Sequence, residues 1–191
     1  MSTKINSFIF PDDIIKDMKD LSKKSIATGR EYGFNLCTNE KDEKYEKYVR
    51  PGQMCKGEKC SIESGEFRCK DDEKTIGIFH THPTSPNPSM SDLSLGYLVG
   101  MNCIGSSEGI KCFKRKKDFD ALAFADIKDV QYKEEQTKFH HSRWKSKEIS
   151  NAEYMRIYSE YKKEIDRVIK DHFEETKISD ATKSRYIQST I

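Results

Sequence analysis

No stretch of this sequence approaches the ~20 consecutive apolar residues that a membrane-spanning helix requires, and its first residues lack the long apolar core of a secretory signal. Neither sign of charge predominates, because 34 Lys and Arg residues stand against 32 Asp and Glu residues, for a net charge of +2. Such a chain has no broad positive field with which to follow a phosphate backbone. We therefore expect a cytoplasmic protein that binds neither membrane nor nucleic acid.

The chain is long enough for one domain. With 191 residues it can bury about 70% of the surface that its unfolded form exposes, which suffices for a hydrophobic core. Charged residues make up 35% of the sequence and the mean hydropathy is −0.85, so the surface is polar. Residues 1–191 are thus expected to form a single domain.

Two histidines stand at the end of an apolar run. The run at 75–79 predicts a buried strand, and its two-residue period aims His80 and His82 toward the same side. Prolines at positions 83, 86 and 88 then require the strand to stop and a stiff loop to follow. The two imidazoles are therefore expected to converge on one point.

A serine and an aspartate follow this loop in the spacing of a helix N-terminus. Ser89 and Asp92 precede leucines at 93, 95 and 98, a capping-box pattern with the serine as N-cap and the aspartate in the first turn. The helix is expected to span residues 91–99. Asp92 can then face the two histidines.

Two imidazoles and a carboxylate supply the three protein ligands of a catalytic zinc site, which leaves a fourth position for water. Hydrolysis also needs a base for the proton of that water and a donor for the oxyanion, and Glu31 and Ser89 are the candidates. Taken alone, H-x-H on a strand is often incidental and S-x-x-D is often only a cap. Joined in this order between a strand and a helix, they indicate a metal site.

The joined pattern resembles that of the JAMM, or MPN-plus, metalloproteases, in which an upstream glutamate precedes H-x-H-P and S-x-x-D. The segment from Glu31 to Leu36 looks like the family's E-x-G-G-x-L strand entry, with Phe34 where the second glycine is usual. The loop between His82 and Ser89 is also one residue shorter than the commonest family form.

The resemblance implies a cytidine-deaminase-like α/β fold, with a central mixed sheet flanked by helices and residues 1–191 as one catalytic domain. It implies that His80, His82 and Asp92 bind one Zn²⁺ per chain. It also implies that Glu31 is the general base and that Ser89 stabilises the oxyanion.

The implied function is hydrolysis of the isopeptide bond between a ubiquitin-like modifier and its target. Processing of a small sulfur-carrier protein uses the same chemistry and remains an alternative, and both kinds of partner end in Gly-Gly. Two other hypotheses do not involve this hydrolysis. One is a non-catalytic MPN-type scaffold subunit, although such subunits typically lack the metal ligands. The other is a DNA-linked role, which the near-neutral charge disfavours. A homodimer or a larger assembly is left open.

The remaining periodicity predicts further helices and strands. We expect an opening helix at 11–25, a strand at 33–37, a charged surface insertion at 39–48, strands at 101–104, 110–114 and 121–125, and a helix at 149–176. The basic run at 114–117 is interpreted as a solvated turn after a strand.

The six cysteines are consistent with more than one state. Cys55, Cys60 and Cys69 form a cluster before the predicted metal-site strand, and the others are at 37, 103 and 112. Plain thiols, disulfides, of which Cys55–Cys60 is the first candidate, and a second zinc site that recruits a fourth ligand all fit this spacing.

Overall fold

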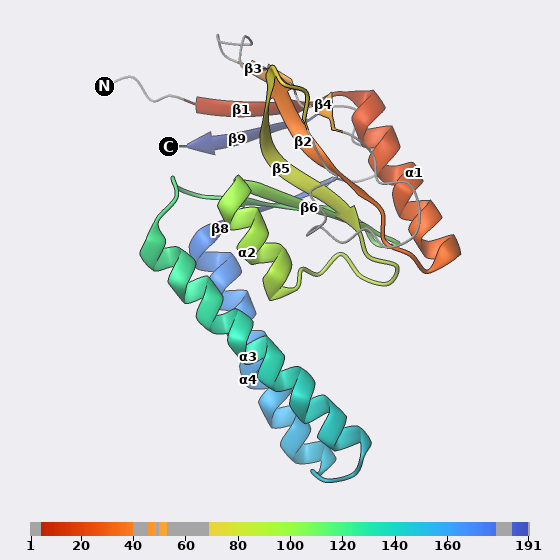
Figure 1. The fold of residues 1–191 in the computed structure, drawn as a ribbon, viewed down its shortest axis with the longest axis vertical. Helices are drawn as coiled ribbons and strands as arrows, with labels where there is room; N and C mark the ends of the chain where they lie inside the picture. Colours follow the sequence, from red (N-terminus) through yellow and green to blue (C-terminus); the bar gives the residue numbers. More distant parts are fainter. Residues whose placement is uncertain (1–4, 40–45, 49, 53–68, 179–184, 191) are drawn as a thin grey trace.

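The computed structural model describes residues 5–39, 46–48, 50–52, 69–178 and 185–190. Within them the chain forms a larger and a smaller sheet together with helices (Figure 1). In chain order the elements are β1 (Ile5–Phe10), α1 (Asp12–Thr28), β2 (Gly33–Asn39), β3 (Glu46–Tyr48), β4 (Arg50–Pro51), β5 (Glu73–Thr81), α2 (Met90–Val99), β6 (Met101–Ser106), β7 (Gly109–Arg115), α3 (Ala121–Lys145), α4 (Asn151–His172), β8 (Phe173–Ile178) and β9 (Arg185–Thr190).

The larger sheet is mixed, with strand order β4-β2-β5-β6-β7-β8. β5 and β6 are parallel, and the other pairs are antiparallel. Neighbouring residues of a central strand face opposite helices: Cys103 packs with α1, whereas Ile104 packs with α2. Because both faces are covered, β6 is buried throughout. The protein is therefore of the α/β class, with a mixed sheet flanked by helices.

The opening helix fits its prediction closely. Pro11 occupies the N-cap of α1, and Gly29 ends the helix in the left-handed conformation. Ile14, Ile15 and Met18 are buried against the sheet, as the apolar stripe predicts.

The smaller sheet has the order β3-β1-β9. β1 is parallel to β3 and antiparallel to β9, so residues from near both ends of the chain lie side by side (Figure 1). The expected charged insertion at 39–48 lies mostly outside the described residues, but β3 within it is a strand.

α3 and α4 run antiparallel and project from the sheets as a helical arm (Figure 1). The base of the arm is fixed by Asp126, which accepts bidentate hydrogen bonds from Arg167 at 2.8 and 2.9 Å and lies 3.0 Å from Nε2 of His172. Apolar residues of the arm's base also pack against α2. The arm therefore forms part of the support for α2.

Two predictions about the C-terminal half are wrong. Residues 121–125 are not a strand but the start of α3, where Asp120 caps the helix by accepting a hydrogen bond from the backbone N–H of Leu122. The helix predicted at 149–176 ends at His172, and β8 follows because Phe173 continues into the edge of the larger sheet. Sheet pairing over a long distance in sequence overrides the local helical pattern here.

The basic run is also more structured than predicted. Lys114 and Arg115 belong to β7, and only the following lysines lie in a turn. The Lys114 ammonium is buried with no hydrogen-bond partner among the described residues, and it lies 4.8 Å from the centre of the Phe8 ring. Burial lowers the pKa of Lys114 to about 8, although the charge of Glu174 opposes this shift.

Four of the cysteines form disulfides, Cys37–Cys69 and Cys103–Cys112. The expectation of plain thiols is wrong for these four, and Cys69 has no thiolate to offer a second zinc site. Cys55 and Cys60 lie outside the described residues.

Disulfides persist in oxidising compartments and in the cytoplasm of some hyperthermophiles, so the cytoplasmic location stays a prediction. Among the described helices, none has the length and apolar character that would let it cross a membrane.

Candidate metal centre

His80 and His82 occupy the end of β5 and the position just after it. His80 is the penultimate residue of the strand and is buried, and β5 ends at Thr81, as the prolines predicted. The backbone N–H of His82 still donates to the carbonyl of Gly105 on β6 at 2.8 Å. This bond extends the parallel pairing by one residue and fixes where the second imidazole begins.

Asp92 is placed by the predicted capping box. Oγ of Ser89 accepts from the backbone N–H of Asp92 at 3.1 Å, while Oδ2 of Asp92 accepts from the backbone N–H of Ser89 at 2.7 Å. The Ser89 hydroxyl also donates to Oδ2 at 2.8 Å. These bonds occupy one carboxylate oxygen and leave Oδ1 directed at His80.

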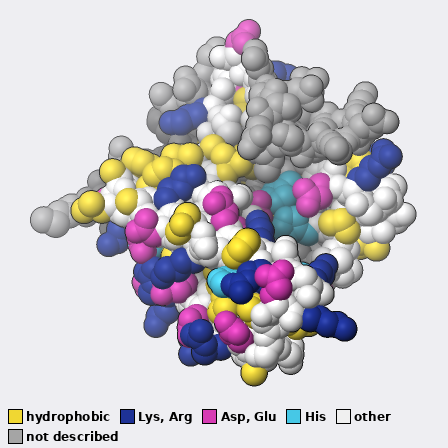
Figure 2. Space-filling view, turned by 60° about the horizontal axis from the view of Figure 1, so that its bottom comes forward, with side chains coloured by type: hydrophobic (Ala, Val, Ile, Leu, Met, Phe, Trp, Pro, Cys, Tyr) yellow, Lys and Arg dark blue, Asp and Glu magenta, His cyan; other side chains and the backbone are white. Residues whose placement is uncertain are grey.

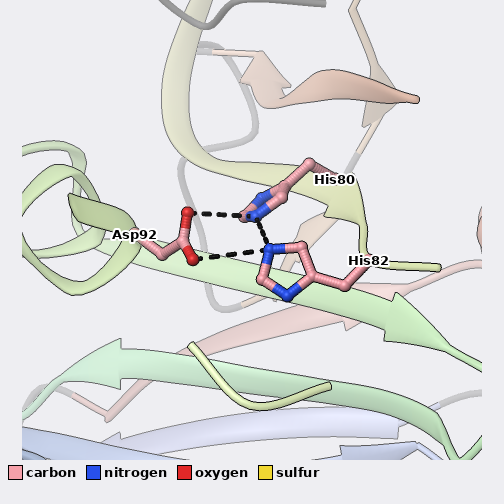
Figure 3. Close-up of side chains that lie close together, drawn as sticks. All are labelled: His80, His82 and Asp92. Carbon is pink, nitrogen blue, oxygen red and sulfur yellow. Dashed lines mark hydrogen bonds and ion pairs between the residues drawn. The ribbon is translucent and has the colours of Figure 1, made fainter. Parts of the chain in front are cut away.

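The three side chains converge (Figure 3). Nε2 of His80 lies 3.1 Å from Nε2 of His82 and 3.1 Å from Oδ1 of Asp92, and Nε2 of His82 lies 3.5 Å from Oδ2 of Asp92. Ligands held about 2.0–2.1 Å from a tetrahedral ion are about 3.3–3.4 Å apart. The donor atoms are thus already spaced for a small metal ion, and the shorter loop between His82 and Ser89 does not prevent this.

The carboxylate is held in its charged form. Burial would raise the pKa of Asp92, but the hydrogen bond and charge of His80, the backbone N–H of Ser89 and the charge of His82 together lower this pKa to about 2. At neutral pH, Asp92 is therefore an anion that can serve as a metal ligand. Two imidazoles and one carboxylate are a donor set that binds divalent metals.

Glu31 precedes the strand that pairs with His80. Gly33 pairs with His80, and the adjacent backbone groups of Tyr32 and Thr81 are also joined, since the N–H of Thr81 donates to the carbonyl of Tyr32 at 2.8 Å. Glu31 and His82 both lie just beyond these strands, and an unbroken register would set them opposite each other. The Glu31 side chain is exposed, and no described hydrogen bond or ion pair joins it to the three ligands.

Gly33, the first residue of β2, packs so closely against β5 that a side chain has no room there. A Cβ atom at Gly33 would lie 2.6 Å from the carbonyl oxygen of Phe79 and 3.1 Å from Cβ of His80. The next residue, Phe34, points to the opposite face, where its ring lies 5.0 Å from that of Phe79 in the core beside α1. The departure from the family pattern at position 34 therefore does not touch the metal centre.

Several residues that support the centre have no signature in the sequence. Thr81 is buried, and its hydroxyl accepts from the backbone N–H of Tyr32 at 2.8 Å. Asn102 of β6 donates from Nδ2 to the carbonyl of Asp92 at 2.8 Å. Gln131 of α3 bonds to serines on both sides of Asp92 in α2. Only the sheet order and the packing of α3 bring these residues together.

Figure 2 views the molecule from the side toward which the arm points. Lys, Arg, Asp and Glu side chains are mixed over this face, and a histidine-coloured patch is set back among them.

No protein-family model matches the chain, and no curated protein is significantly similar to it. The interpretation of the centre therefore depends on its own geometry.

Proposed function

We propose that this protein is a zinc-dependent isopeptidase of the JAMM type. The observation that carries the proposal is the convergence of His80, His82 and Asp92 at distances of 3.1 to 3.5 Å. A mixed sheet with a helix on each face supports a cytidine-deaminase-like fold of the JAMM/MPN kind.

Zinc bound by these ligands would lower the pKa of a water molecule and polarise the carbonyl of the scissile bond. Glu31 is the candidate to accept a proton beside the centre, because its side chain is exposed and it precedes Gly33, the strand partner of His80, by two residues. The same carboxyl group can return the proton to the leaving amine. Its exposed side chain can adopt the geometry that proton transfer needs once a substrate is bound.

Ser89 has one hydroxyl proton, and in this structure it donates that proton to Asp92. Its first role is therefore to hold the aspartate. To stabilise an oxyanion as well, the hydroxyl would turn toward the substrate while its oxygen kept the capping bond from the backbone of Asp92.

The proposed substrates are proteins linked through the C-terminal Gly-Gly of a ubiquitin-like modifier. Processing of a sulfur-carrier protein remains the alternative, because it needs the same centre. The three ligands disfavour a non-catalytic scaffold, for which their convergence would have no use.

The test is cleavage of a panel of isopeptide-linked ubiquitin and ubiquitin-like conjugates. Wild type, chelator-treated wild type and Glu31→Ala are compared, with Glu135→Ala as the control because Glu135 is an exposed glutamate on the arm. We expect the wild type and Glu135→Ala to cleave a conjugate and the other two samples to fail, with zinc retained in Glu31→Ala.

Full activity of Glu31→Ala would remove Glu31 as the base. Zinc-loaded wild type that cleaves no conjugate would contradict the isopeptidase proposal, and cleavage of a sulfur-carrier fusion by that sample would support the alternative.

A further inference from the structure

The base of the arm contacts the turn of α2 that carries Asp92. Nε2 of Gln131 donates to Oγ of Ser91 at 3.2 Å, and Oε1 of Gln131 accepts from Oγ of Ser94 at 3.0 Å. Nζ of Lys128 also donates to Oε1 at 2.9 Å, which fixes the orientation of the amide. One side chain of α3 thus bonds to two residues of α2 at once.

These two serines flank the metal ligand. Ser91 and Ser94 are three residues apart, so they lie on the same side of α2, and Asp92 is about 100° around the helix from Ser91. Bonds to both serines therefore fix the rotation of α2 about its own axis. Asn102 holds the backbone of the same turn from β6, through the carbonyl of Asp92.

Small rotations matter at this position. Side-chain atoms about 5–6 Å from a helix axis move by about 1 Å when the helix turns by roughly 10°. Metal–ligand distances hold within about 0.2 Å of their usual values. The apolar cluster that contains Met90, Leu93 and Val130 secures α2 against the arm, but apolar packing is not directional as hydrogen bonds are.

The second helix of the arm also packs beside α2. Tyr161 of α4 packs against the apolar cluster that contains Met90 and Leu93 of α2. Both helices of the arm therefore contribute to the support of α2.

We propose that Gln131 is a positioning residue of the metal centre, which sets the direction of Asp92 by bonding to Ser91 and Ser94. This inference rests on the proposed function, because it assumes that Asp92 is a metal ligand. The arm then contributes to metal binding, because α3 holds α2, which carries Asp92, in a fixed position relative to His80 on β5.

The experiment measures the zinc dissociation constant by competition with a chromophoric chelator. Gln131→Ala removes both bonds, whereas Gln131→Glu keeps an acceptor for each serine hydroxyl and for Lys128. Gln136→Ala makes the same chemical change at an exposed position of α3. We expect Gln131→Ala to bind zinc roughly tenfold more weakly and the other two variants to match the wild type.

Two further measurements separate positioning from general stability. The thermal midpoint of the metal-free proteins reports folding, and the visible spectrum of the cobalt-substituted proteins reports the geometry of the ligands. We expect an altered cobalt spectrum only in Gln131→Ala. A variant with both Ser91→Ala and Ser94→Ala removes the same bonds from α2, and it should reproduce the weakened affinity even where Gln131→Ala folds poorly.

Wild-type zinc affinity in Gln131→Ala would overturn the inference, provided that Asp92→Ala loses the metal. Equal weakening in Gln136→Ala would also overturn it, because the effect would then be a general one. A wild type that binds no zinc would overturn the proposed function itself, together with this inference.

Discussion

Replacing Gly33 by alanine tests whether strand β2 positions the metal ligand on β5. The added methyl group would lie 2.6 Å from the carbonyl oxygen of Phe79 and 3.1 Å from Cβ of His80. The first contact is with backbone, which cannot move aside like the end of a flexible side chain. Strand β2 or strand β5 must therefore shift near His80.

The expected change in the stability of Gly33→Ala is the difference between two opposing effects. Replacing glycine at a compatible site stabilises a protein by about 0.4–1 kcal/mol through the unfolded chain, whereas overpacking costs about 1–3 kcal/mol. We expect a net loss of about 1–2 kcal/mol, which lowers the Tm of a protein of this size by roughly 2–8 °C. Displacement of His80 should also weaken zinc binding about tenfold.

Gly29→Ala is the matched control. Gly29 has φ = 66°, so alanine there is strained, but its Cβ would meet nothing within 4 Å. Thermal unfolding and chelator competition should show a comparable loss of stability in both variants and a loss of zinc affinity only in Gly33→Ala. The reasoning is refuted if Gly33→Ala binds zinc as tightly as the wild type, or if Gly29→Ala weakens binding equally.

Three further predictions concern stability and disulfide pairing. Lys114→Met should stabilise the fold at pH 7 by about 1 kcal/mol in chemical denaturation. Because the pKa of Lys114 is lowered from 10.5 to about 8, the difference in the free energy of unfolding between variant and wild type should narrow as pH rises through that range. A variant less stable than the wild type would contradict this. Asp126→Asn should lower the free energy of unfolding by about 1 kcal/mol or less. The pKa of Asp126 is lowered from 3.8 to about 2 by the hydrogen bond from Arg167 and by His172, so this loss should be full above pH 4 and vanish as pH falls toward 2. A loss of stability that does not change with pH would refute the prediction. Under non-reducing denaturation a thiol reagent should find at most two reactive thiols, because four of the six cysteines are paired, and six would disprove the pairing.

The convergence of the three candidate metal ligands was predictable because the information that places them is local. His80 and His82 share one strand end, and Ser89 and Asp92 share one helix N-terminus, so strand period and capping chemistry determine much of their geometry. The position of Glu31 depends on pairing between β2 and β5, and it followed only from the family resemblance. The strand pairing begins at Gly33 and His80, so the role of Glu31 stays a prediction.

The arm and the outer strands were less predictable for physical reasons. Residues 121–125 are apolar enough for a strand, and only the cap at Asp120 and the continuing stripe through Ile127 and Val130 make them helical. β8 directly follows α4 in the sequence, yet it pairs with β7, which precedes both helices of the arm. Pairings of this kind depend on tertiary contacts.

The most direct test of the central claim is the zinc content of the purified protein after dialysis against metal-buffered solution. Wild type should retain about one zinc ion per chain, and Asp92→Ala and His80→Ala should retain almost none under the same conditions. A wild type without zinc, or an Asp92→Ala variant with the same zinc content as the wild type, would contradict the assignment of this metal centre.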